Sequence, residues 1–471
     1  MFEFNREQTV TLHLTWFAFF LTFVAWFNMA PFNTTLIRVA GLSAEQVNIL
    51  MICNVALTIP ARIFIGTLVD VYGPRLVFTA LLVFSGVVCF QFALAQTFGE
   101  ILLSRLLMGI AGAGFVVGIK MIAEWFPPGK MGTAQGIYAG WGNFGAAAAA
   151  FSLPPIAGLF SPEIGWRMAT GFSGLCCLAW AFIYFKNAVD HPERADRFIV
   201  GLEHTIDVTH RRDLVLQICL LIPVYAALGA FIWKLSGHPL FLLTPFMTWV
   251  VAGCIVLIYL WNVLQCLRFN LPRLAGPIPP EQQYEFRQIV VLSLVYALTF
   301  GSELAVVSMF PGFLENTFGL SVTVAGVLGS SFAFMNLVTR PSGGWLSDLI
   351  GRRRTLYILV LGAMVCYWIM SKIDAAWPLE WAVAVAILCS VFLQAGNGAC
   401  FACVPLIRRD LTGKLAGMAG AYGNVGAVYF LTLLSFVGPQ AFFKTISIYA
   451  VAVLASLLFL RSFKNLHVSY H

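Results

Sequence analysis

The sequence predicts an all-α membrane protein in which two six-helix bundles flank two further transmembrane helices, giving fourteen spans. The first observation is composition, because hydrophobic residues make up 60% of the 471 residues and charged residues only 10%. Soluble domains carry about 45–50% apolar and about 25% charged residues, so this chain requires lipid as its solvent. The other two observations are the spacing of the apolar segments and an internal repeat.

Fourteen segments are apolar over about the 20 residues that a helix needs to cross a bilayer core. We expect these spans at residues 14–32, 46–68, 76–95, 99–125, 131–159, 166–186, 214–235, 242–266, 289–312, 321–348, 355–372, 379–405, 414–438 and 442–461. No segment between them is long enough to form a soluble domain.

The basic residues predict the orientation of the spans. An even number of spans puts both termini on one side, and cytoplasmic loops carry most of the Lys and Arg residues. With both termini cytoplasmic, the inner segments hold nineteen Lys and Arg residues and the outer segments hold five.

No basic run indicates nucleic acid binding. The eleven cysteines lie in apolar stretches, so we expect no disulfide framework, and we expect the first span to be retained rather than cleaved.

An internal repeat relates the first and last parts of the chain. The pattern G-x-L-x-D-x-x-G-x-R occurs twice, each time four residues after an arginine and with one offset of 278, as Arg62 with 66–75 and Arg340 with 344–353. A second match pairs Gly-Asn-Phe-Gly at 142–145 with Gly-Asn-Val-Gly at 423–426, at an offset of 281. Duplication explains these matches better than chance does.

The repeat predicts the domain organisation. We expect an N-terminal six-helix half at 1–186, a linker at 187–288 that carries the inserted hairpin at about 214–266, and a C-terminal half at 289–471. Parallel six-helix halves related by an axis along the membrane normal are typical of a transporter that rocks around a central site.

The repeated motifs resemble those of a known family. The two G-x-L-x-D-x-x-G-x-R loops are similar to those of the major facilitator superfamily. Phe126-Pro127 with residues 132–145 resembles the nitrate signature of the nitrate/nitrite porter family, residues 421–427 resemble its second copy, and 299–304 are also similar. The resemblance implies the major facilitator fold. It also implies transport of nitrate and/or nitrite across a bacterial inner membrane by alternating access, as nitrate/nitrite exchange or as proton-coupled uptake.

Arg62 and Arg340 are the main candidates for binding an anion. Arg62 lies eight residues before Asp70, roughly 12 Å along a helix and close to mid-bilayer, and Arg340 repeats that depth before Asp348. An arginine there costs at least about 2.5 kcal/mol and faces a partner or a cavity. The alternative is a buried ion pair, but no acidic residue recurs at this depth in both halves. Two guanidinium forks suit a small planar oxyanion, and the resemblance implies that both arginines bind substrate.

The remaining substrate-binding candidates come from the glycine signatures and from two aromatic residues. They are Gly142, Gly423, Asn143, Asn424, Phe115 and Tyr296. For the two glycines, plain helix packing is as well supported as substrate contact. The two asparagines are polar residues in apolar helices, which favours contact with the site or a cross-helix hydrogen bond. The resemblance implies that the phenylalanine ring packs against the anion, and the tyrosine hydroxyl can donate to an oxyanion.

Two aspartates at helix ends are candidates for gating. Asp70 and Asp348 can pair with Arg75, with Arg353 or with the N-terminus of a neighbouring helix. Such pairing would hold the inner side closed in one conformation. Arg105 lies near the outer edge of its span, and we expect its side chain to reach toward the interface.

Glu303 is the candidate for coupling. It lies about fourteen residues into its helix, where a buried carboxyl group could carry a proton, and a salt bridge or a hydrogen bond is an equally supported alternative. No histidine lies deep in a core helix, which excludes a histidine relay. Lys120 and Glu124 are spaced i, i+4, so we expect them to pair with each other.

The sequence leaves other functions open. Another small anion, or an organelle-specific role such as iron handling, would keep the transporter class. A non-transporting membrane sensor or scaffold would use the hairpin as a docking surface, although both arginines are present. No nucleophile–base pair, metal cluster or cofactor motif indicates an enzyme. We expect no cofactor or metal. We also expect a monomer, whose partners are the lipid bilayer, a small inorganic anion and, if coupled, protons.

Overall fold

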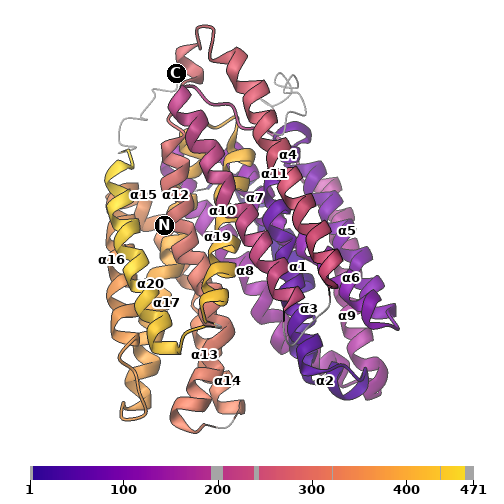
Figure 1. Cartoon of the computed structure of the whole chain (residues 1–471). Coiled ribbons are helices and arrows are strands. Elements are labelled where there is room, and N and C mark those ends of the chain that lie inside the picture. The colour runs from indigo at the N-terminus through magenta and orange to yellow at the C-terminus, as the bar shows by residue number, and fades with distance from the viewer. Residues whose placement is uncertain (1–3, 192–204, 238–242, 321, 435, 462–471) are drawn as a thin grey trace.

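The computed structural model is a helical bundle throughout the ranges that it describes. These ranges are residues 4–191, 205–237, 243–320, 322–434 and 436–461, and all regular secondary structure within them is helical. Figure 1 shows an early set of helices (indigo to purple) beside a late set (orange to yellow), with two long helices, α10 (Arg211–Ser236) and α11 (Pro245–Arg273), in front.

The early helix set contains the first six expected spans. Its elements are α1 (Arg6–Phe27), η1 (Ala30–Phe32), α2 (Asn33–Val39), α3 (Ala44–Ala56), α4 (Thr58–Tyr72), α5 (Pro74–Leu94), α6 (Phe98–Met108), η2 (Gly109–Ala113), α7 (Gly114–Trp125), α8 (Pro128–Ala157) and α9 (Pro162–Asn187). Its second span is interrupted at Leu57, between α3 and α4. Its fourth span passes through the 3-10 turn η2 between α6 and α7.

The late helix set repeats this arrangement. After the single turn η4 (Pro280–Gln282), its elements are α12 (Arg287–Tyr296), η5 (Ala297–Gly301), α13 (Ser302–Phe318), α14 (Val322–Phe334), α15 (Asn336–Ile350), α16 (Arg352–Met370), α17 (Leu379–Phe401), α18 (Val404–Ile407), α19 (Thr412–Leu434), α20 (Pro439–Ser456) and η6 (Leu457–Phe459). Its second span is interrupted between α14 and α15, as the second span of the early set is.

Eleven helical stretches in the described ranges are long and apolar enough to cross a membrane. Three other expected spans are helical but are not among the eleven: α8, α14 with α15, and α19. Residues 321 and 435, which the sequence places within two of these spans, lie outside the described residues. The count of fourteen spans therefore stays a prediction.

Local sequence signals explain several helix ends. Capping boxes begin α1, α3 and α6, through Asn5 with Gln8, Ser43 with Gln46, and Thr97 with Glu100. Gly73 ends α4 with φ of 93°, and Gly351 ends α15 with φ of 97°. Glycine adopts positive φ without the steric cost of a Cβ atom, so the turn has nearly the same shape in both copies of the repeated loop.

The two helix sets pack on each other along two seams, α8 against α15 and α4 against α19. Glycine residues permit the two helices to approach closely at both seams. A Cβ atom on Gly136 of α8 would lie 2.7 Å from the Arg340 carbonyl oxygen, and one on Gly417 of α19 would lie 2.5 Å from the Arg62 carbonyl oxygen. The glycine spacing therefore brings both seams close to the two repeated arginines.

The inserted hairpin packs on the outside of one seam. α10 contacts α11 and α19, where the Tyr422 hydroxyl donates to the Leu220 carbonyl at 2.7 Å. Phe231 of α10 packs against residues of α3. α11 leaves Phe246 and Trp249 each 78% exposed, which suits a helix that faces lipid.

Candidate functional site

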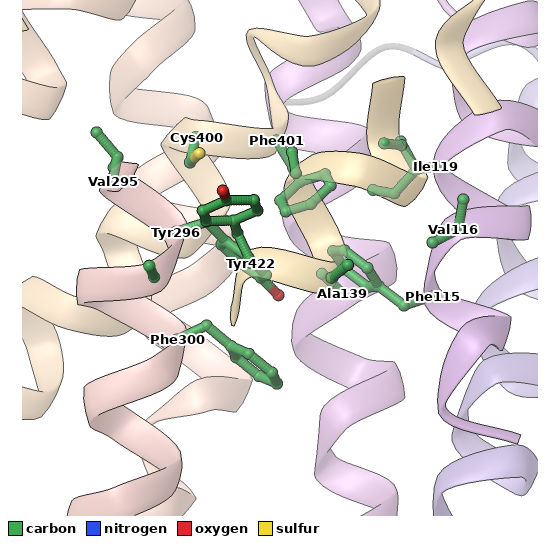
Figure 2. Packing of buried hydrophobic residues seen from close by; sticks show 14 of the residues in the cluster. Phe115, Val116, Ile119, Ala139, Val295, Tyr296, Phe300, Cys400, Phe401 and Tyr422 are labelled. Atoms are coloured by element: carbon green, nitrogen blue, oxygen red, sulfur yellow. The ribbon is translucent and has the colours of Figure 1, made fainter. Parts of the chain in front are cut away.

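A π-helical turn, η5, places two aromatic rings at the centre of the bundle. Such turns insert an extra residue into a helix and are frequent at functional sites. Tyr296 ends α12 and Phe300 lies inside η5, and their rings stack with centroids 5.0 Å apart and planes 3° apart. Both rings are buried, and Figure 2 shows them on the late-set helix that faces the early set.

Arg62 lies in α4 at the seam with α19 and is fully buried. Its Nε donates to the Gly112 carbonyl at 3.3 Å, and its Nη1 donates to the Gly420 carbonyl at 2.7 Å. Its Cζ lies 5.4 Å from the Phe115 ring centroid and 5.3 Å from that of Phe300. Arg62 has no salt bridge to a described carboxylate. Carbonyl dipoles and ring faces therefore surround its charge.

Arg340 occupies the matching place in the late set, but it has a carboxylate partner. It is 1% exposed, and its Nη2 lies 3.2 Å from Glu303 Oε2. Its Nε donates to Asn336 Oδ1 at 2.5 Å. The sequence-based alternative of a buried ion pair therefore describes Arg340 and not Arg62.

Glu303 is enclosed by donors. Its Oε1 accepts from Asn336 Nδ2 at 2.6 Å and from Gln394 Nε2 at 3.4 Å. Its Oε2 accepts from Asn397 Nδ2 at 2.6 Å and from Arg340 Nη2 at 3.2 Å. An ionised carboxylate has only acceptors, so four donors suit its charged form, and a proton on either oxygen would oppose one of them.

The Phe300 ring connects the two arginines. The Cζ of Arg340 lies 5.3 Å from its centroid, the same distance as the Cζ of Arg62. The two guanidinium carbons are therefore no farther apart than twice that distance. Two arginines and the single carboxylate of Glu303 leave one net positive charge among these buried side chains. A buried charge of this kind requires a partner, and one monovalent anion would supply it.

Phe115 reaches the centre from the early set. Its ring is nearly parallel to that of Tyr296, at 6.1 Å and 7°, and meets the Phe401 ring edge-on at 4.5 Å. Figure 2 shows these three rings together where the two helix sets face each other. The structure thus brings Phe115, Tyr296 and both arginines into one site.

The two predicted asparagines lie in different surroundings. Asn143 is half-buried and donates to the Ala139 carbonyl of its own helix at 2.7 Å. Asn424 is fully buried one turn beyond Gly420, and neither polar atom of its side chain has a hydrogen-bond partner among the described residues. The Tyr296 hydroxyl is also buried and forms no hydrogen bond of good geometry among the described residues, although it lies close to the Arg62 guanidinium. An unsatisfied buried group costs about 1–3 kcal/mol, so Asn424 and Tyr296 are available to a ligand.

Gly142 and Gly423 contribute by packing. A Cβ atom on Gly423 would lie 2.6 Å from ring atoms of both Tyr296 and Phe300. A Cβ atom on Gly142 would overlap the ring of Phe19. Gly423 therefore positions the central rings, whereas Gly142 lets α8 pack closely on α1.

Asp70 and Asp348 each accept hydrogen bonds from backbone N–H groups near the start of a helix of the opposite set. Asp70, in the last turn of α4, accepts from the N–H groups of Gly413 and Lys414 at 2.9 and 2.7 Å, in the first turn of α19. Asp348, in the last turn of α15, accepts from the N–H groups of Gly132 and Thr133, in the second turn of α8, at 3.2 and 2.8 Å. Of the pairings considered from the sequence, the structure shows the neighbouring helix N-terminus. We call the two arrangements the Asp70 latch and the Asp348 latch.

Arg75 and Arg353 bind backbone carbonyls and not the two latch aspartates. Arg75 donates to the Phe185 carbonyl at 3.0 and 2.7 Å from Nε and Nη2. Arg353 donates to the Leu458 carbonyl at 3.1 Å. These contacts tie the first turns of α5 and α16 to α9 and η6 within the same helix set, so the arginines hold each set together rather than joining the two.

One expectation for another cation needs correction, and a second is confirmed with an addition: Lys120 pairs with Glu124 as expected and pairs more closely with Asp70. Arg105 does not reach the interface, because it is fully buried and donates to Asn28 Oδ1 at 3.0 Å. Lys120 has a nearer partner than Glu124: its Nζ lies 2.9 Å from Asp70 Oδ1 and 3.8 Å from Glu124 Oε1. Helix packing explains both differences, since it brings acceptors from other helices to each side chain.

Five further residues belong to the site and are absent from the predicted set: Phe300, Asn336, Gln394, Asn397 and Phe401. The three polar ones carried a signal, because amide side chains are rare in apolar spans and mark contacts there. Asn336 also lies one helical turn before Arg340, on the same face. Phe300 lies in the stretch 299–304 that resembles the porter family, but that resemblance assigned it no role among the 42 phenylalanines.

Comparison with known proteins identifies the family. The model of the Major Facilitator Superfamily matches residues 15–431 and 292–469. The nitrate/nitrite transporter NrtP of Picosynechococcus sp. is 43% identical over 92% of this chain and 86% of its own length. NrtP of Nostoc punctiforme is 42% identical over 96% and 91%. The probable nitrate/nitrite antiporter NarK1 of Thermus thermophilus is 26% identical over 97% and 92%.

Solved structures agree on the fold. The proton:xylose symporter XylE superposes with a TM-score of 0.66 at 15% identity, over 97% of this chain and 96% of that one. This likeness concerns the fold alone. The close relatives are transporters rather than enzymes. The chain is thus a multi-pass membrane protein of the Major Facilitator Superfamily and belongs, within it, to the nitrate/nitrite porter family.

Proposed function

We propose that this chain moves nitrate, nitrite or both across a bacterial inner membrane by alternating access, as a monomer without a cofactor. The relatives named NrtP, at 42% and 43% identity, support this substrate class. In this proposal residues 1–186 and 289–471 are the rocking halves, and residues 187–288 link them through the hairpin.

The fourteen-span topology is part of the proposal. Of the three spans that are not among the eleven, α8, α15 and α19 supply three of the four helices that form the two seams, and the fourth, α4, belongs to one of the eleven. Other helices cover much of their surface there, so glycine and polar residues are tolerated, and they do not need the hydropathy of a span that faces lipid.

The observation that carries the proposal is the charge balance at the centre. Arg62 and Arg340 face one ring, and Glu303 neutralises only one of them. A monovalent oxyanion would neutralise the other. Each guanidinium fork can donate two parallel N–H bonds to adjacent oxygens of a planar anion, which an ammonium group cannot do.

The surrounding residues suit the same ligand. Phe115, Tyr296 and Phe300 offer flat faces to a planar anion, and the Tyr296 hydroxyl and Asn424 amide can donate to its oxygens. We propose that Gly423 serves by positioning these rings. Asn143 and Gly142 lie beside the site in α8 and support helix packing in this proposal.

The two latches support a gating role at one end of the bundle. Both ends of the described chain lie at that end: Gln8 donates to the Trp125 carbonyl at 3.0 Å beyond Lys120, and Leu458 accepts from Arg353 beyond Asp348. The excess of basic residues in these loops favours the cytoplasmic side. We propose that the structure is closed toward the cytoplasm and that opening breaks both latches.

We propose that Glu303 is the counter-ion of Arg340, because its four donors suit the charged carboxylate. A proton-carrying role makes a different prediction for Glu303→Gln: exchange of nitrate for nitrite would survive, and proton-driven accumulation would collapse. In the counter-ion role both activities fall together, because Arg340 is left uncompensated. Exchange and proton-driven uptake, measured in parallel in proteoliposomes, separate the two roles.

Uptake of labelled anions tests the proposal as a whole. Purified protein in liposomes is assayed with nitrate, nitrite, chloride and formate, with and without a proton gradient. Nitrate or nitrite should be taken up in preference to the other two anions, and Arg62→Lys should reduce that uptake. Preference for chloride or formate, or uptake unaffected by Arg62→Lys, would refute the substrate assignment.

A further inference from the structure

The Asp70 latch and the Asp348 latch are built from equivalent backbone positions. Gly132 and Gly413 each donate to Oδ1 of the facing aspartate, and the next residue of each helix donates to Oδ2. These donors are separated by the same 281 residues that relate the two glycine signatures. The two latches therefore have one design, which allows their remaining parts to be compared position by position.

The Asp348 latch contains a cation from its own loop. Arg352 is the first residue of α16, directly after the positive-φ Gly351. Its Nη2 lies 2.5 Å from Asp348 Oδ1 and donates to the Pro128 carbonyl of the opposite set at 2.9 Å. One guanidinium thus neutralises the latch aspartate and bonds across the interface.

The Asp70 latch has no cation at the equivalent position. Gly73 adopts the same turn as Gly351, and the next residue, which begins α5, is Pro74. Proline carries no charge and no donor. The carboxylate of Asp70 is nevertheless only 2% exposed, so its burial requires a positive partner from elsewhere.

Lys120 supplies that partner from a different helix. It lies in α7, and its Nζ is 2.9 Å from Asp70 Oδ1. The same Nζ donates to the carbonyls of Arg409 and Asp410, at 3.2 and 2.9 Å, in the opposite helix set. Arg409 follows Pro128 by the same 281 residues. Lys120 therefore bonds the same kinds of acceptor as Arg352 does, a latch aspartate and a backbone carbonyl at or just before the start of the opposing helix.

We propose that Lys120 is the closing cation of the Asp70 latch and takes the part that Arg352 takes in the other. This inference rests on the proposed alternating access. Lys120 and Asp70 belong to the same helix set, so the ion pair stays together when the sets separate, and only the bonds to the two carbonyls break. Opening therefore separates no charges.

Loss of the Lys120 charge should favour the open state for two reasons. The closed state loses the cross-interface bonds of the ammonium group, and the buried Asp70 carboxylate loses its ion pair with Lys120, whereas water solvates Asp70 once the latch opens. Because hydrogen bonds to charged groups are among the stronger ones, we expect the ratio of open to closed molecules to rise at least about tenfold in Lys120→Met.

Distance measurement between spin labels tests the proposal. Labels at Tyr72 and Arg354, exposed residues at the latch ends of the two helix sets, are introduced as noncanonical amino acids, so the native cysteines stay in place. Lys120→Met should lengthen the distance in a larger fraction of molecules. Adding Pro74→Arg should restore the wild-type distribution, because it places a guanidinium at the position equivalent to that of Arg352.

Lys372→Met, a substitution at an exposed lysine beyond α16, is the matched control and should leave the distances unchanged. If Lys120→Met does not fold, Lys120→Gln replaces it. The proposal is overturned if the neutral variant at Lys120 leaves the distance distribution unchanged. It is also overturned if adding Pro74→Arg leaves the protein as open as the Lys120 variant alone. The distance measurement does not require transport, so its result does not depend on which anion is the substrate.

Discussion

Removing the charge of Arg62 should abolish tight anion binding while leaving the protein folded. Arg62 is the central cation without a salt bridge among the described residues, so Arg62→Met brings the net charge of the buried group from one positive charge to zero. Arg62→Lys keeps the charge but replaces the planar fork by a point charge. The two substitutions therefore separate the contribution of charge from that of geometry.

The expected losses of nitrate affinity follow from the burial of the site. A monovalent anion about 4 Å from the guanidinium gains about 4 kcal/mol at an effective dielectric constant of about 20. At about 1.4 kcal/mol for each factor of ten, Arg62→Met should weaken nitrate binding several hundred-fold. Arg62→Lys should cost about 1.5–3 kcal/mol for a lost charge-assisted hydrogen bond, which weakens binding about 10- to 100-fold.

Equilibrium binding of nitrate to detergent-solubilised protein measures these effects, with thermal unfolding as the test of folding. Arg105→Lys is the matched control, because Arg105 is also fully buried in the early set but lies outside the site. It should leave nitrate affinity within about threefold of wild type, since the perturbed charge is not at the site. A folded Arg62→Met protein that binds nitrate within about threefold of wild type would refute the charge-balance argument.

Three further predictions concern the surroundings of the arginines. Gly423→Ala should destabilise the protein by about 1–3 kcal/mol and slow uptake, because its Cβ would press on the rings of Tyr296 and Phe300. Gly312→Ala, with no atom within 4 Å of the new Cβ, should change neither unfolding nor uptake. Phe300→Leu should lower the melting temperature, because the ring lies between the two arginines. Added nitrate should recover part of this loss by offsetting the repulsion between the arginines. Equal melting temperatures of the variant with and without nitrate would count against this prediction. Asn424→Ala should stabilise the anion-free protein by about 1–3 kcal/mol yet weaken nitrate binding, and a destabilised anion-free variant would show that the amide already has a partner.

The outline of the fold was readable from the sequence because its signals are local or repeated. Each expected span is a run of apolar residues, and each described span is helical. Hydropathy is a weaker guide for α8 and α19. These helices lie at the seams, and small and polar residues lower their mean hydropathy. A bilayer selects composition only where a helix faces lipid, so hydropathy describes seam helices less well.

The candidate site was predicted in its charged residues and incompletely in its neutral ones. Arg62 and Arg340 stand out because arginine at mid-bilayer is costly and the repeat places both at one depth. Phe300 does not stand out, since its place between the arginines follows from the π-helical turn η5. The runs of apolar residues that predict the spans do not show where such a turn lies.

The sequence by itself determined the membrane class, the twofold repeat and the pair of buried arginines, because composition and duplication are properties of the chain. Only the tertiary structure decided that Glu303 neutralises Arg340 and leaves Arg62 without a carboxylate. It also decided that Lys120 pairs with Asp70, whose loop has Pro74 where the other copy of the loop has Arg352. The physical reason is that an ion pair depends on which helices meet and at what height, and these contacts join residues far apart in the sequence.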